Sequence, residues 1–150
     1  MTGKMKLFKS YVIFGLILLI IGIVFDFTFV ARETSNAFKT DPIPYLNSFK
    51  KQLYDLTKFY MIVLGFLNIT LGLLVARFEN LTKLDWIVFY SVVIGSLLLI
   101  STGFWYASAG PSFKWETRCT VLTIGIFTIV ISLGLEIYRL LSTKNLQNKR

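Results

Sequence analysis

The stretch from Trp86 to Phe113 contains no charged residue, and its length constrains the fold of the whole chain. A helix with a rise of 1.5 Å per residue would place Trp86 and Trp105 about 28 Å apart, close to the ~30 Å hydrocarbon thickness of a bilayer. Tryptophan and tyrosine concentrate at the two interfaces of a membrane, and Tyr106 follows the second tryptophan. The stretch therefore predicts a membrane-spanning helix.

The composition of the chain agrees with this prediction. Hydrophobic residues make up 55% and charged residues 16% of the 150 residues, and the mean hydropathy is +0.66. Ordinary soluble domains contain roughly 45–50% apolar and about 25% charged residues. We therefore expect an integral membrane protein with the bilayer as its main partner, formed by a single domain over residues 1–150.

Three further apolar runs predict a four-span protein. The predicted spans cover residues 10–31, 59–77, 85–107 and 118–140. The first run follows a basic segment, as a signal peptide would. The run is long enough to span a membrane, and Phe29 lies where a cleavage site would need a small residue. Both features favour a retained span. The connection 77–85 is so short that it makes the second and third spans antiparallel neighbours. The predicted fold class is an all-α membrane protein, an antiparallel four-transmembrane-helix bundle.

The longest predicted connection, residues 32–58, has two parts. Pro42 and Pro44 favour an extended passage. Helix is expected to resume after an N-cap at Asn47 or Ser48, because apolar residues then recur with helical spacing. This pattern predicts a short amphipathic juxtamembrane helix before the second span. At the other end of the chain, the polar residues 143–150 are expected to form a disordered tail.

The distribution of basic residues predicts the orientation. Nine Lys and Arg residues flank the side that carries both termini, and seven flank the opposite side. Cytoplasmic loops carry the excess of basic residues, so we expect both termini in the cytoplasm. The basic residues that give the net charge of +8 therefore lie beside the spans, where they set the topology and contact anionic lipid headgroups. We expect no nucleic-acid partner.

Two absences restrict the chemistry of the chain. It contains no histidine and one cysteine, Cys119. It therefore offers no imidazole ligand or base, no internal disulfide and no dithiol relay. It also contains no nucleophile elbow and no phosphate-binding glycine loop. We expect a protein that is not an enzyme and that holds no metal or cofactor.

Small residues spaced seven apart predict how the spans pack. Gly15 and Gly22, Gly65 and Gly72, and Gly125 and Ser132 form such pairs. Small residues allow helix backbones to approach closely in a bilayer, and this spacing keeps them on one seam of a left-handed bundle. In the third span, Ser91 and Gly95 form a tighter pair that suits either the bundle or a homodimer.

Polar residues within the spans are the candidate site residues. Asp26 lies about a turn inside the outer boundary, where a carboxylate must be paired, hydrated or protonated. The favoured interpretation is an ion pair with Arg118. The alternative is an outer polar pocket whose proposed members are Asp26, Arg32, Glu116 and Arg118, with a rim of Trp105, Tyr106 and Trp115.

Two other polar features have structural interpretations. Asn68 lies near the seam of Gly65 and Gly72, where an interhelical hydrogen bond is favoured over a ligand contact. Glu136 and Arg139, three residues apart, are expected to neutralise each other. The sequence therefore predicts that the protein is a non-catalytic accessory subunit, assembly factor or scaffold that binds other membrane subunits or a second copy of itself. The alternative is a lipid or small-solute binding or transport protein that uses the pocket around Asp26.

Overall fold

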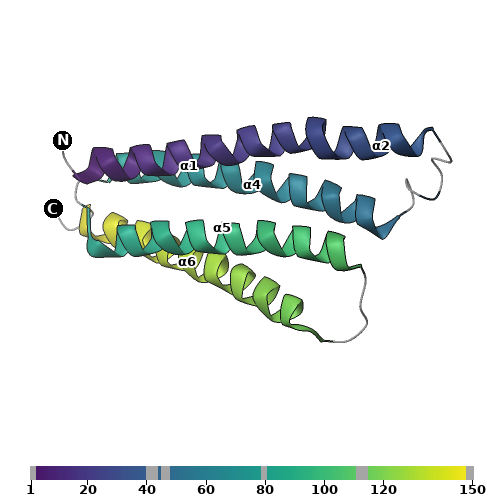
Figure 1. Cartoon of the computed structure of the whole chain (residues 1–150). Coiled ribbons are helices and arrows are strands. Elements are labelled where there is room, and N and C mark those ends of the chain that lie inside the picture. The colour runs from purple at the N-terminus through teal and green to yellow at the C-terminus, as the bar shows by residue number, and fades with distance from the viewer. Residues whose placement is uncertain (1–2, 40–43, 45–47, 79–80, 111–114, 148–150) are drawn as a thin grey trace.

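The structure is a computed structural model that describes residues 3–39, 44, 48–78, 81–110 and 115–147, the last five by their backbone alone. Its described part is entirely helical (Figure 1). The elements are α1 (Gly3–Phe25), the π-helical turn η1 (Asp26–Val30), α2 (Ala31–Ala37), α4 (Phe49–Arg77), α5 (Lys83–Ala109) and α6 (Thr117–Gln147). The first three form one uninterrupted helical segment.

Four long helices run antiparallel, which confirms the predicted four-helix bundle (Figure 1). Each is long and apolar enough to cross a membrane. We name the end of the bundle that carries both chain termini the terminal end, and the opposite end the distal end. Trp86 lies near the terminal end of α5 and Trp105 near its distal end.

Local sequence determines where the helices begin and end. Ser48 caps α4 by accepting a hydrogen bond from the backbone N–H of Lys51 at 3.2 Å, which confirms one of the two predicted N-caps. Thr82 and Asp85 form a capping box at the start of α5. Gly110 ends α5 with a φ of +79°, which glycine adopts without strain.

The helices extend beyond the predicted spans at three places. Helix continues from the first span through Ala37, into the predicted connection. The predicted juxtamembrane helix is the first part of one unbroken helix, α4. Helix α6 continues to Gln147, so residues 143–147 are helical where we expected a disordered tail, because residues 135–147 contain no proline or glycine. Residues 148–150, and Pro42, lie outside the described residues.

Glycine seams hold the helices together in two pairs. A Cβ atom on Gly15 would lie 2.6 Å from the carbonyl oxygen of Gly65, so α1 and α4 meet backbone to backbone. A Cβ atom on Gly95 would lie 3.1 Å from the carbonyl oxygen of Gly125, so α5 and α6 meet in the same way. The predicted seams are confirmed at these glycines, and Gly95 packs within the chain rather than against a second copy.

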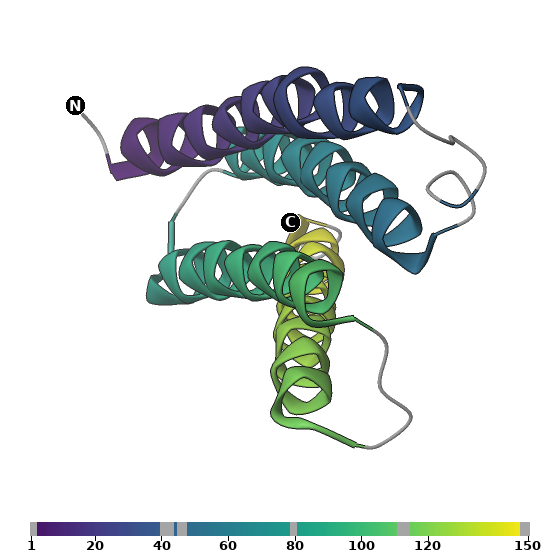
Figure 2. The same cartoon turned by 45° about the vertical axis from the view of Figure 1, so that its right-hand side comes forward.

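Helix α6 and the first helical segment, residues 3–37, are the two least buried of the four long helices. Helix α5 packs against both α4 and α6, whereas no described Cα atom of α6 lies within 8 Å of α1 or α4. Figures 1 and 2 show α6 diverging from the α1–α4 pair toward the distal end. Its side chains Ile129 and Leu133 reach the apolar core, and most of the remaining surface of the helix stays open.

Candidate functional site

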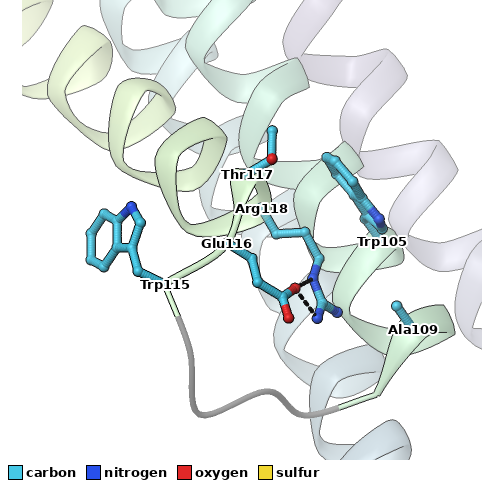
Figure 3. A pocket seen from close by; sticks show the side chains of 6 residues that line it. All are labelled: Trp105, Ala109, Trp115, Glu116, Thr117 and Arg118. Carbon is cyan, nitrogen blue, oxygen red and sulfur yellow. Dashed lines mark hydrogen bonds and ion pairs between the residues drawn. The ribbon is translucent and has the colours of Figure 1, made fainter.

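A cavity of about 440 Å³ lies at the distal end, between the last turn of α5 and the start of α6. Two helix ends supply its lining, and Figure 3 shows the side chains around it. The lining residues are Trp105, Ala109, Trp115, Glu116, Thr117 and Arg118. We name this cavity the distal pocket.

The guanidinium group of Arg118 organises the distal pocket. Its Nε donates a hydrogen bond to Oε2 of Glu116 at 2.7 Å, and its Nη2 donates to the same oxygen. Its Nη1 donates to the carbonyl oxygen of Gly110 at 3.0 Å, and its Cζ lies 4.7 Å from the centre of the Tyr106 ring. Arg118 thereby ties the start of α6 to the end of α5, and Glu116 balances its charge.

Two tryptophans give the distal pocket an apolar rim. Trp105 is 44% exposed and Trp115 is 75% exposed, and Figure 3 shows them on either side of the ion pair. The indole N–H of Trp115 donates to the hydroxyl of Thr120 at 3.1 Å, which fixes the ring beside α6. Charged groups of both signs below exposed aromatic rings suit a ligand that is partly polar and partly apolar.

The structure brings together four of the predicted site residues. Trp105, Trp115, Glu116 and Arg118 line the distal pocket. Arg32 is exposed on α2 and does not line it. Asn68 is fully buried in the core, where its amide N–H donates to the carbonyl oxygen of Leu64 at 2.8 Å. We expected Asn68 to bond to another helix, but its amide N–H bonds within its own helix, α4.

Asp26 is paired, but not with the predicted partner. Its Oδ1 lies 2.8 Å from Nζ of Lys58, and Arg118 pairs with Glu116 instead. The prediction failed because α4 extends past the span and brings Lys58 alongside η1, whereas α6 diverges and does not pack against η1. The predicted pocket centred on Asp26 is therefore wrong, and Asp26 belongs to the contact between η1 and α4.

A second group of polar residues lies near the terminal end. The sequence did not predict this group. Arg139 forms an ion pair with Asp85, and its Cζ lies 3.9 Å from the centre of the Phe78 ring. Tyr11 interacts electrostatically with both Glu136 and Arg139, and it is 1% exposed. We name Tyr11, Asp85, Glu136 and Arg139 the terminal cluster. The predicted pairing of Glu136 with Arg139 is replaced by that of Asp85 with Arg139.

The position of Asp85 explains why this cluster was missed. Asp85 stands where the predicted connection 77–85 meets the predicted span 85–107, yet it starts a heptad series on α5 that continues with Val92 and Leu99, and all three face the core. Its Oδ2 also accepts from the backbone N–H of Thr82 at 2.6 Å. Extending the apolar periodicity of the third span backwards would have placed this carboxylate inside the bundle.

The chemistry of the described residues is limited. They contain no group of three or more Asp, Glu or Cys side chains placed to hold a metal ion. The Cys119 thiol lies 2.8 Å from the hydroxyl of Tyr106 within the contact between α5 and α6. Comparisons with protein-family models, curated proteins and solved structures find no match.

Proposed function

We propose that this protein is a non-catalytic component of a membrane protein complex, an accessory subunit, assembly factor or scaffold that binds a partner's transmembrane helix along α6. The observation that carries the proposal is an exposed heptad series on a helix whose backbone, among the described residues, comes within 8 Å of α5 alone. The series alternates steps of three and four residues and comprises Ile124, Phe127, Ile131, Gly134, Tyr138 and Leu141. A helix surface with this spacing suits packing against a second helix.

Gly134 strengthens the proposal because it leaves a hollow in this series. A Cβ atom on Gly134 would meet no described atom within 4 Å, so the described part of the chain does not use this glycine for packing. In membranes, glycines on helix surfaces allow another backbone to approach closely. The exposed face of α1 differs, since its large residues such as Ile17 and Ile20 leave no such gap, and Gly15 and Gly22 face α4.

Purification in native lipid discs, followed by mass spectrometry of the bound proteins, tests this proposal. Gly134→Leu fills the hollow without touching the bundle, so the variant should fold normally and lose the co-purifying protein. Ala76→Leu enlarges an exposed small residue on α4 and serves as the matched control. A partner that is a second copy would appear as a dimer. Retention of the same protein by both variants, or lipid alone bound to the wild type, would contradict the proposal.

A second candidate function rests on the distal pocket. An ion pair between two exposed tryptophans fits a zwitterionic lipid headgroup or an amphipathic solute, which the chain would bind or transport. Native mass spectrometry should detect a lipid that Trp115→Ala loses. Phe27→Ala is the control, because Phe27 is 74% exposed and Trp115 is 75% exposed. Equal lipid retention by the two variants would contradict this function.

We also propose that the terminal end faces the cytoplasm, which the excess of basic residues on that side supports. Single cysteines placed near Lys4 and Lys149 in a Cys119→Ser background should both resist an impermeant thiol reagent added from outside. Labelling of both would reverse the orientation, and labelling of one would contradict an even number of spans.

A further inference from the structure

The terminal cluster contains a buried carboxylate, that of Glu136, with one oxygen that accepts no hydrogen bond from the described residues. Glu136 is 4% exposed, and its Oε1 has no hydrogen-bond partner among the described residues. It lies on α6 within a helix long and apolar enough to span a membrane. A buried polar atom without a partner is rare in folded proteins, so this one calls for a ligand.

The charged groups around Glu136 do not neutralise it. Asp85, on the one helix that packs along α6, adds a second carboxylate, and the positive charge of Arg139 faces that carboxylate in an ion pair. Tyr11, from α1, contributes a neutral phenol. The basic residues at the adjoining ends of α4 and α5, Arg77 and Lys83, are exposed. Among the described side chains, an ionised Glu136 would therefore leave this apolar region with one unbalanced negative charge.

We infer that Glu136 is an intramembrane proton-binding site. One proton bound to the carboxylate forms a neutral carboxylic acid, with one new O–H bond and no transfer of electrons. The acid removes the unbalanced charge and adds a donor to a site that otherwise offers an acceptor alone. Glu136 lies nearer the terminal end than the distal end of the span Thr117–Ser142, so the proton enters and leaves from the terminal side.

The geometry favours a proton over a metal cation. Sodium and divalent cations need several oxygen ligands around one point, and Glu136 contributes a single oxygen without a partner. The described residues form no group of three carboxylates or thiols that could complete such a shell. A proton needs one oxygen only. This inference does not depend on the proposed docking of a partner along α6.

An apolar carbodiimide tests the inference on the full-length protein in lipid discs. Such reagents add to protonated carboxyl groups in membranes and leave a stable adduct that peptide mass spectrometry locates. We expect the adduct on Glu136, declining as the pH is raised and unchanged by sodium. Asp26 and Glu116, both ion-paired, should remain unmodified in the same sample and serve as internal controls. Protection of Glu136 by sodium would assign the site to a cation and overturn the inference.

Infrared spectroscopy provides a second measurement that does not require access of a reagent. The carbonyl band of a protonated carboxylic acid should be present in the wild-type spectrum at neutral pH and lost in Glu136→Gln. Glu33→Gln, at a half-exposed side chain on α2, should leave the band unchanged. Identical spectra for the wild type and Glu136→Gln would overturn the inference. Should Glu136→Gln fail to fold, the carbodiimide map of the wild-type protein still decides.

Discussion

The contact between Gly15 and Gly65 predicts a large effect from a single added methyl group. In Gly15→Ala, the new Cβ atom would lie 2.6 Å from the carbonyl oxygen of Gly65 and 2.7 Å from Cγ1 of Ile69. Rotation of a side chain cannot relieve the first contact, because the oxygen belongs to the backbone. The α1 and α4 backbones must therefore move apart at this level.

The size of the effect follows from the distances. Ordinary contacts begin at 3.4 Å, so the helices must separate by about 0.8 Å. A gap of roughly this size removes a quarter to a half of the dispersion energy of the atoms it separates. Overpacking in a tight contact costs about 1–3 kcal/mol, and the better helix propensity of alanine returns up to ~1 kcal/mol. We expect Gly15→Ala to lower the free energy of unfolding by about 1–2 kcal/mol.

Reversible unfolding in mixed detergent micelles, followed by circular dichroism, measures this difference. Gly134→Ala is the matched control, because its Cβ atom meets no described atom within 4 Å and the change should stabilise the protein by up to ~1 kcal/mol. A Gly15→Ala protein as stable as the wild type, in an assay that detects the gain of Gly134→Ala, would refute the close contact between α1 and α4.

Four further predictions concern charged side chains. In a double-mutant cycle, Asp26→Asn and Lys58→Gln should couple by less than about 1 kcal/mol, because the side chains are 44% and 28% exposed. The effects of Asp26→Asn and Arg118→Gln should instead add. Asp85→Asn or Arg139→Gln should each cost about 3–5 kcal/mol, and the double variant less than their sum, as melting experiments would show. Arg118→Gln should also speed amide hydrogen exchange in residues 115–120 and leave the terminal end unchanged, because it releases the ends of α5 and α6 from each other.

The fold could be predicted from the sequence because its determinants are local. Runs of apolar residues, the cap at Ser48 and the glycines spaced seven apart act within one helix or between neighbours along the chain. The same locality explains the distal pocket, since Trp105 and Arg118 flank a single short connection. Short connections leave little freedom in how the residues on either side of them meet.

The pairing of charges could not be predicted, because it depends on how far helices extend and where they diverge. Asp26 and Lys58 meet because α4 continues beyond the apolar span. Asp85 and Arg139 meet because α5 begins two residues before the predicted span, which places Asp85 on the buried face of the helix. In both cases an error of a few residues at a helix end changed which side chains share a level of the bundle.

Site-specific photocrosslinking tests the docking of a partner helix along α6 most directly. A photoreactive amino acid at Ile131 should crosslink to another polypeptide in intact membranes. The same probe at Ile20 should capture lipid alone, although the two isoleucines are 59% and 60% exposed. A protein adduct at Ile131 and none at Ile20 is the result that the proposed function predicts. Lipid adducts alone at both positions would show that α6 faces the bilayer, and they would contradict the proposed function.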